Sequence, residues 1–194
     1  FQAESNAAEE ATTPNVPGAW RGWREFRVAR REFEDRGQAQ CSFYLEPVDG
    51  LPLQPFQAGQ FLTFELPIAT RKVARCYSLS DRPDPKRYRV TIKRLGPPAD
   101  RPDLPPGVAS SHFHDNVHEG GLLKVKAPTG VFFLGPEATV PAVFVAGGIG
   151  ITPMMSMLSW ALAEQPGRAL YLFYGVRHGG EHAAAGAGAR HFDT

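Results

Sequence analysis

The residues with the clearest chemical potential lie in one hexapeptide, Arg75-Cys76-Tyr77-Ser78-Leu79-Ser80. If this segment is a β-strand, its side chains alternate, with Arg75 and Tyr77 on one face. Cys76 and Ser78 then lie on the other face. An arginine fork suits a phosphate group, and a phenol ring suits stacking on a flat heterocycle. The hexapeptide therefore indicates a planar, phosphorylated ligand, although an ordinary edge strand fits it equally well.

Two further segments combine small residues with the start of a predicted helix. The first is Gly147-Gly148-Ile149-Gly150-Ile151-Thr152-Pro153, in which Thr152 suits an N-cap and Pro153 suits the first helical position. The second is Gly107-Val108-Ala109-Ser110-Ser111. Glycine lets a ligand approach the backbone closely, and the free N–H groups of a first helical turn attract an anion. Each segment predicts an anion site, whereas a ligand-free connection and a plain serine N-cap are the respective alternatives.

Basic residues follow two predicted strands. Ile92-Lys93-Arg94 ends one of them, where a phosphate contact competes with an ordinary solvated strand end. Arg177 and His178 follow another, at the position where the adenosine ribose of a bound dinucleotide normally lies. An acidic residue there favours the free 2′-hydroxyl of NAD, so a cation favours a 2′-phosphate.

The number and spacing of the histidine and cysteine residues exclude several kinds of metal site. On a helix His114 and His118 share a face but His112 does not, and no carboxylate or cysteine set completes a site, so we expect solvated or capping roles. The two cysteines are too few for an all-cysteine iron–sulfur cluster. Their small number also makes a reducing cytoplasm the expected compartment.

The composition is that of a globular protein with one good core or two small ones. The chain has 194 residues, 42% of them hydrophobic, and a formal net charge of +1, which excludes a broad nucleic-acid footprint. No apolar run approaches the roughly 20 residues that span a bilayer. Because the first residue is Phe1, we expect a fragment or a processed chain.

Alternating apolar and polar residues predict six short strands separated by turns, which is typical of a small antiparallel barrel. The predicted strands cover residues 25–33, 41–45, 59–66, 75–80, 88–93 and 123–127. We expect Pro67 to end the third strand. A helix is predicted over 108–119, with Gly120-Gly121 as its C-terminal cap.

After Pro136 the pattern changes to that of a parallel sheet. Residues 142–146 form a continuous apolar run, as expected of a strand buried on both faces. A helix over 153–164 and a strand over 169–174 complete a βαβ unit. A doubly wound sheet has about five or six strands, so this domain is incomplete in the given sequence. The predicted organisation is a flexible tail over 1–19, a barrel domain over 20–138 and a partial nucleotide-binding domain over 139–194.

In this order, the motifs resemble the ferredoxin–NADP reductase superfamily, above all its bacterial oxygenase reductases and the reductase part of flavohaemoglobins. The resemblance covers residues 23–178. Its signals are Arg75-x-Tyr77-Ser78 with Ser80, Ile92-Lys93, Gly107-x-x-Ser110, Pro128-x-Gly130 and Gly147-Gly148-x-Gly150-x-Thr152-Pro153. It implies a six-stranded antiparallel flavin-binding barrel followed by an incomplete parallel α/β nucleotide-binding domain.

The resemblance also implies FAD as cofactor, with FMN as the less favoured alternative, and NAD(P)H as electron donor. Arg75 is expected to hold the pyrophosphate, with Tyr77 against the isoalloxazine and Ser78 near its N5. Tyr77, Ser78 and Thr152 are the implied residues of the reaction centre. The implied cofactor contacts are Arg75, Cys76, Tyr77, Ser78, Thr91, Ile92, Lys93, Gly107, Val108, Ala109, Ser110, Gly147, Gly148, Gly150, Thr152 and Arg177. We expect the side chain of Cys76 to pack towards the barrel interior.

The implied activity is electron transfer. A hydride passes from NAD(P)H to FAD, and single electrons then pass to a [2Fe–2S] ferredoxin domain or protein, or to a haem protein. A non-catalytic flavin module for docking or sensing is the alternative. Two departures from the family pattern stand out: Val131 replaces a frequent Asp, and the Cys-Gly motif that ends the nicotinamide domain is absent from the given sequence.

Overall fold

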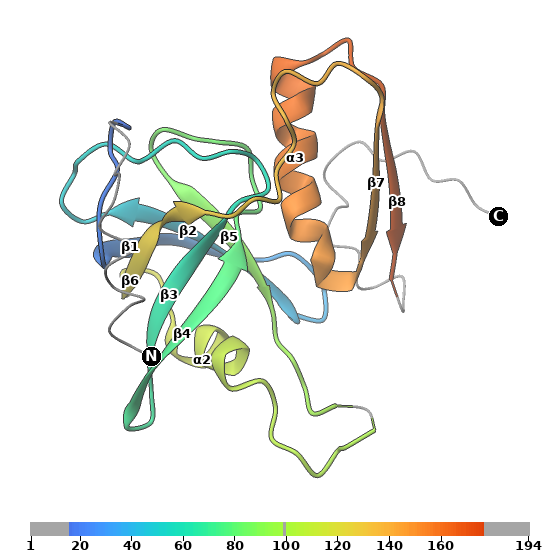
Figure 1. Cartoon of the computed structure of the whole chain (residues 1–194). Coiled ribbons are helices and arrows are strands. Elements are labelled where there is room, and N and C mark those ends of the chain that lie inside the picture. Colours follow the sequence, from blue (N-terminus) through green and yellow to red (C-terminus); the bar gives the residue numbers. More distant parts are fainter. Residues whose placement is uncertain (1–15, 99, 177–194) are drawn as a thin grey trace, which may run out of the picture.

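Six antiparallel strands build the first part of the molecule, for which the computed structural model describes residues 16–98 and 100–176. In chain order they are β1 (Arg24–Phe33), β2 (Gln40–Pro47), β3 (Phe61–Ile68), β4 (Arg71–Ser78), β5 (Tyr88–Lys93) and β6 (Leu122–Thr129). Their order across the sheet is β4-β3-β6-β1-β2-β5. The two outer strands meet at a seam, because Leu79 forms an isolated bridge with Val90. This arrangement confirms the predicted antiparallel barrel (Figure 1).

Strand β6, the last barrel strand in sequence, pairs with β1, the first. It returns between β3 and β1, and its Val125 lies opposite Arg24 in the register with β1. The indole Nε1 of Trp20 also donates to the carbonyl of Val125 at 3.1 Å, across 105 residues of sequence. The barrel is therefore completed by contacts between distant parts of the chain.

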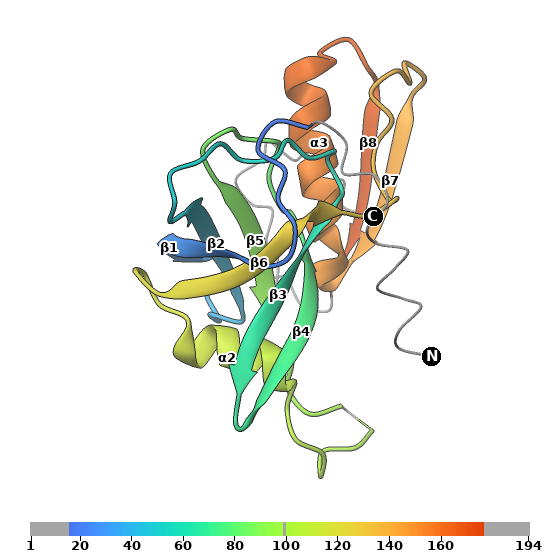
Figure 2. The same ribbon diagram turned by 60° about the vertical axis from the view of Figure 1, so that its left-hand side comes forward.

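Helix α2 (Val108–Asn116) lies across one end of the barrel, as both ribbon views show (Figure 2). Phe113 is fully buried, and its ring centroid lies between 5.2 and 5.3 Å from those of Phe43, Phe64 and Tyr77. Such T-shaped contacts, in which the edge of one ring meets the face of another, are favourable in a core. The helix therefore completes the barrel core rather than lying loosely on its surface.

The prediction that Pro67 ends β3 is wrong. The strand continues to Ile68, and β4 begins at Arg71, so a two-residue hairpin turn joins them with Ala69 at a φ of 53°. Pairing of β3 with β6 extends only to Glu65. Pro67 lies beyond that point, so its missing N–H removes no hydrogen bond to β6.

The prediction for the end of α2 is also wrong. The helix stops at Asn116, and the extended Val117 is its C-cap. Gly120 and Gly121 do not cap it, because they exchange backbone hydrogen bonds of 2.8 and 2.9 Å with Val28 of β1. These glycines therefore belong to the antiparallel ladder that leads into β6.

The second part of the molecule is a parallel β–α–β unit, as predicted. It consists of β7 (Ala142–Gly147), the 3₁₀ turn η1 (Gly148–Gly150), α3 (Ile151–Glu164) and β8 (Leu170–Gly175). Among the described residues α3 covers only one face of the two-stranded sheet, so β7 is not buried on both faces as expected. Phe144 is buried, whereas Val143 and Val145 are 62% and 71% exposed.

The start of α3 differs from the prediction by two residues. The N-cap is Gly150 rather than Thr152, and the helix begins at Ile151. The Thr152 hydroxyl instead donates to the carbonyl of Ile149 at 3.1 Å, within the turn itself. Within residues 16–98 and 100–176, neither helix has the length and apolar character needed to cross a membrane.

Candidate functional site

The predicted ligand strand is the edge strand β4. The ring of Tyr77 is half-buried and packs against those of Phe64 and Phe113, at 5.9 and 5.2 Å between centroids. Burial raises the pKa of the Tyr77 phenol, and the nearby Arg75 cation opposes that shift. The phenol is therefore neutral at physiological pH. The core rings of Phe64 and Phe113 support the Tyr77 ring.

Arg75 is exposed, and its Nη1 donates to the carbonyl of Ala74 at 2.8 Å. Within the described part of the chain no carboxylate forms an ion pair with it. A guanidinium without a protein counter-ion is available for an anionic ligand.

The alternation of side chains in β4 is as predicted, but the prediction for Cys76 is wrong. Arg75 and Tyr77 lie opposite Phe64 and Leu62, which are fully buried, so that face looks inward. Cys76 lies opposite Thr63 on the outer face, is exposed, and has its Sγ 3.4 Å from the Thr63 hydroxyl. It does not pack into the barrel.

A chain of buried hydroxyl groups closes the seam between β4 and β5. Thr91 Oγ1 donates to Ser80 Oγ at 2.8 Å and lies 2.7 Å from Ser42 Oγ. Arg89 donates from Nε to the same Ser42 oxygen and pairs with Glu34 at 2.6 Å. The Thr91 side chain, predicted to contact the cofactor, is therefore engaged within the protein and leaves its backbone for that role.

The first turn of α2 has backbone N–H groups that the helix itself does not use. Its N-cap is Gly107, no side chain caps it, and the first intrahelical bond runs from the Ser111 N–H to the Gly107 carbonyl. The preceding N–H groups, of Val108, Ala109 and Ser110, consequently have no partner within the helix. Together with the positive end of the helix dipole they suit a phosphate.

Ser110 is buried and does not serve as a plain N-cap. Its hydroxyl donates to the Gly107 carbonyl at 2.9 Å and accepts a hydrogen bond from the Leu95 N–H at 3.1 Å. A Cβ at Gly107 would lie 2.8 Å from that hydroxyl and 2.9 Å from the Leu95 Cβ. This close approach explains why a glycine stands before the helix.

The glycine turn at the end of β7 leads directly into α3. Gly148 has a φ of 50°, a conformation that favours glycine, and its carbonyl accepts a hydrogen bond from the Tyr174 hydroxyl at 3.1 Å. No side chain caps α3, but its first N–H, that of Ile151, already donates to the carbonyls of Gly148 and Ile149 in the 3₁₀ turn. Thr152 is 8% exposed and its hydroxyl bonds within the turn, so only the backbone there remains for a ligand.

The two parts of the molecule meet at α3 (Figures 1 and 2). The fully buried Ser156 hydroxyl donates to the Asp81 carbonyl at 2.7 Å, and Asp81 directly follows the hexapeptide of β4. Met157 packs near Gly59, where an added Cβ would lie 2.3 Å from the Met157 Cε. Helix α3, which begins at the glycine turn, is thereby held against the loop that follows the ligand strand.

Sequence reasoning missed two groups of residues at this site. Ser156 and Asp81 carry no motif, because their contact depends on how two domains meet. His114 was expected to be solvated or capping, but it is 4% exposed and its Nε2 lies 2.9 Å from the Ile92 carbonyl oxygen. Its spacing of four residues from Ser110 was the available signal. Arg177 lies outside the described residues.

Comparisons with known proteins agree with this geometry. Residues 37–134 match the oxidoreductase FAD-binding domain family, and residues 144–186 match the oxidoreductase NAD-binding domain family. The flavohemoprotein of Halalkalibacterium halodurans is 38% identical over 185 residues, which are 94% of this chain and 43% of that protein. Fold and site thus define an oxidoreductase module that binds FAD and a pyridine nucleotide.

Solved structures give the same result. The flavohem-like FAD/NAD-binding domain of nitric oxide dioxygenase from Vibrio cholerae superposes with a TM-score of 0.76 at 33% identity, covering 86% of this chain and 68% of that one. Phthalate dioxygenase reductase gives a TM-score of 0.67 at 34% identity, over 82% of this chain and 46% of that one. The chain belongs to the ferredoxin–NADP reductase superfamily. It spans about two fifths of the length of the flavohemoproteins that it matches.

Proposed function

We propose that this chain is a reductase module that moves a hydride from NAD(P)H to FAD and then single electrons to an iron–sulfur or haem acceptor. Bound FAD supplies the conversion between two-electron and one-electron transfer, while the protein supplies position and electrostatics. The contact between Ser156 and Asp81 carries the proposal, since it fixes the helix of the glycine turn against the ligand strand. Hydride transfer requires two reactants held in contact, which such a junction provides.

The residues present fit a flavin dinucleotide. Arg75 and the uncapped N–H groups of Val108, Ala109 and Ser110 bind the pyrophosphate. Gly107 keeps that surface free of a side chain. Both sets of groups are positive or hydrogen-donating, which suits a diphosphate and would repel a cation.

The ring system of the flavin is proposed to lie along the ends of β4 and β5. Tyr77 supports its plane, and the partly exposed Ser78 donates a hydrogen bond near N5. Cys76, whose side chain lies on the outer face of β4, is proposed to contact it through the backbone. The backbone of Thr91 and Ile92 and the side chain of Lys93 line it from β5.

The pyridine nucleotide is proposed to bind at the glycine turn. Gly147, Gly148 and Gly150 allow the dinucleotide to approach the backbone, and Thr152 stands at the contact between nicotinamide and flavin. Arg177 is proposed to meet a 2′-phosphate, which favours NADPH. The proposed domains accordingly cover residues 20–138 for FAD and 139–194 for the nucleotide, after a tail at 1–19.

The proposed acceptor and compartment follow from the relatives and from the cysteines. The relatives named above are flavohemoproteins and a reductase described as transferring electrons from pyridine nucleotides to [2Fe-2S]. A haem protein or a [2Fe–2S] ferredoxin domain or protein is thus the proposed partner. The cysteines Cys41 and Cys76 are both free, which is compatible with the cytoplasm proposed for this chain.

Reconstitution with flavin tests the proposal. The purified chain is mixed with FAD or FMN, separated from free flavin, and examined for a flavin absorbance band. NADH or NADPH is then added without oxygen. Retained FAD that bleaches on addition supports the reductase, with faster bleaching by NADPH expected.

The non-catalytic docking or sensing module is the second candidate, and the same experiment separates the two. A chain that retains FAD but whose absorbance band is unchanged by either nucleotide supports that module. A colourless protein after reconstitution rejects both.

A further inference from the structure

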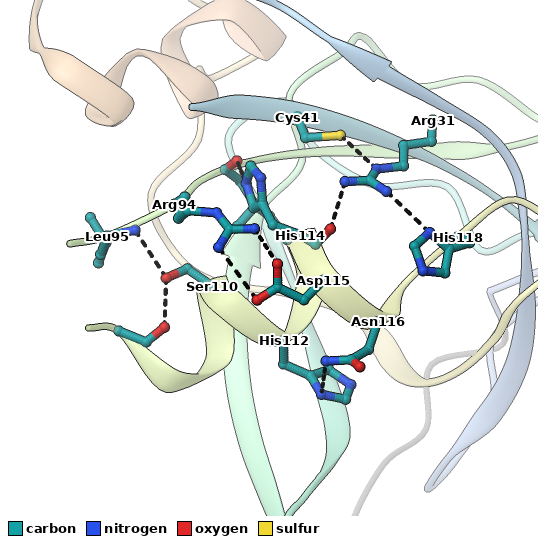
Figure 3. A network of polar contacts seen from close by, with 12 residues as sticks. Arg31, Cys41, Arg94, Leu95, Ser110, His112, His114, Asp115, Asn116 and His118 are labelled. Carbon is teal, nitrogen blue, oxygen red and sulfur yellow. Dashed lines mark hydrogen bonds and ion pairs between the residues drawn. The ribbon is translucent and has the colours of Figure 1, made fainter. Parts of the chain in front are cut away.

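Three side chains of α2 join the helix to the end of β5 (Figure 3). Ser110 accepts the hydrogen bond of the Leu95 N–H, and Nε2 of His114 lies 2.9 Å from the Ile92 carbonyl oxygen. The Asp115 carboxylate pairs with both terminal nitrogens of Arg94. Residues four apart share a helix face, so Ser110 and His114 reach the same strand end one turn apart. We refer to these three contacts as the α2–β5 clasp.

His114 is the buried centre of the clasp. Arg31 of β1 donates from Nη2 to its backbone carbonyl at 2.7 Å, and the same guanidinium lies 3.2 Å from the His118 ring nitrogen and 3.3 Å from Cys41 Sγ. A carbonyl oxygen only accepts, so Nε2 of His114 carries the hydrogen. The His114 ring therefore acts as a hydrogen-bond donor, whether neutral or cationic. The Ile92 carbonyl holds the ring, and Arg31 holds the backbone of the same residue.

The covalent chain does not set the distance between β5 and α2. Between Leu95 and Gly107 it makes an excursion away from the barrel that holds five prolines. Its two ends are joined by the Gly107 N–H, which donates to the Leu95 carbonyl at 2.9 Å, and by Ser110. Phe113 anchors α2 in the barrel core, and the clasp contacts of His114 and Asp115 further along the helix add direct bonds that fix its distance from β5.

This distance matters to a ligand that spans both elements. In the flavin site proposed above, Ile92 lies beside the ring system and the α2 N-terminus holds the pyrophosphate. FAD carries both groups in one molecule, joined by the ribityl chain that limits their separation, whereas riboflavin has only the ring and the ribityl chain. If the protein already holds the ring and pyrophosphate subsites at the distance that bound FAD requires, FAD binding does not have to order them, and the affinity is higher.

We propose that His114 is a positioning residue that sets the separation of the ring and pyrophosphate subsites and thereby favours FAD over flavins without a pyrophosphate. This inference rests on the proposed function. It assigns to His114 no contact with the cofactor.

The test uses the complete chain, FAD and riboflavin as probes, and quenching of flavin fluorescence to measure dissociation constants. His114→Phe keeps a ring next to Phe33, whose centroid lies 6.2 Å from that of His114, but it removes the donor. FAD affinity is expected to fall about tenfold, a size typical of one buried hydrogen bond, with riboflavin affinity changed less than about twofold.

Two variants separate the hydrogen bond from the ring. His114→Gln lacks the ring but places an amide N–H the same number of bonds from Cα, so it is expected to restore most of the FAD affinity. His112→Gln is the matched control, because the hydrogen bond given for its ring among the described residues is to Asn116 of the same helix, and it should leave both flavins unaffected.

If His114→Phe does not fold, Asp115→Asn supplies the test at an exposed position. It weakens the clasp and is expected to lower FAD affinity about twofold without affecting riboflavin. Asp103→Asn, which opens the exposed pair with Arg101, is its control.

Unchanged FAD affinity in His114→Phe, an equal loss for both flavins, or failure of His114→Gln to recover would overturn the inference. These results differ from failure of the proposed function, in which the unmodified chain itself binds neither flavin.

Discussion

Arg75 and Tyr77 lie on one face of one strand, yet their contributions to the protein differ. Tyr77 packs against the barrel core, whereas the hydrogen bond that the described residues give Arg75 is to the backbone of its own strand. Removal of Tyr77 would therefore combine a packing defect with any loss of ligand. Removal of Arg75 isolates the ligand contact.

We expect Arg75→Ala to weaken FAD binding about tenfold or more, because a charge-assisted hydrogen bond to phosphate is lost. The melting temperature of the flavin-free protein should not change, since the side chain is exposed. Fluorescence titration with FAD and thermal unfolding without it measure the two effects. Arg71→Ala, on the same strand and also exposed, is the control. Equal losses of FAD affinity in the two variants would show that Arg75 does not bind FAD.

Stability should depend on pH through the α2 histidines. Burial lowers the pKa of His114, with Arg94 and Arg31 adding to the shift, and the Ile92 carbonyl and Asp115 opposing it. Burial likewise lowers the pKa of His112. A group with a depressed folded pKa stabilises the protein fully above its unfolded pKa, about 6.5 for histidine.

The free energy of unfolding should consequently fall as the pH is lowered from 7 through 6.5 and below. Urea unfolding at a series of pH values measures this slope. In His114→Gln, which does not titrate in this range, the slope should be shallower than in the unmodified chain. An identical slope would show that His114 is not the group responsible.

At the scale of elements, packing of the barrel against α3 requires a glycine at position 59. Gly59 has a φ of 110°, and an added Cβ would meet the Met157 side chain and, at 2.5 Å, the Phe132 carbonyl oxygen. Backbone atoms cannot yield as a flexible side chain can. The loop before β3 and helix α3 therefore pack only if this position carries no side chain.

Gly59→Ala should lower the free energy of unfolding by about 1–3 kcal/mol, combining backbone strain with overpacking. Gly50→Ala is a matched control, because Gly50 also has a positive φ, 67°, but open space around its Cβ position. Chemical denaturation should show a clearly smaller loss for Gly50→Ala. Equal losses would mean that the contact with α3 contributes nothing.

Elements were predictable wherever local pattern decides them. The sequence pattern located parts of all six barrel strands, although β4 begins at Arg71 and not at Arg75, and the apolar run located β7. The errors arose where a partner distant in sequence decides the structure. Gly120 and Gly121 pair with Val28 and so do not cap the helix. Pro67 can lie within β3 because β3 no longer pairs with β6 at that point. Likewise the hydroxyls of Thr91, Ser110 and Thr152 looked like ligand contacts. In the fold they bond to the protein, because burial leaves them no water.

At the scale of the whole molecule, Ser156 links the two cofactor regions through one hydrogen bond. Ser156→Ala would leave the Asp81 carbonyl without this buried donor and loosen α3 against the barrel. We expect FAD affinity to stay the same while anaerobic reduction by NADPH slows several-fold. Stopped-flow absorbance measures the reduction rate. Ser159→Ala, on the same helix, is the control, and equal rates in both variants would contradict the role given to the junction.

The return of β6 between β3 and β1 has a consequence for how the protein is made. Trp20 and Arg24 find their partner Val125 only after about 100 further residues have been added. At typical synthesis rates of about 5–20 residues per second, that takes roughly 5–20 s. Contacts of such sequence separation also slow folding from the complete chain. During this interval β1 can pair only with β2, and its other edge is open to neighbouring chains, so chaperone demand should be highest before residue 129 emerges.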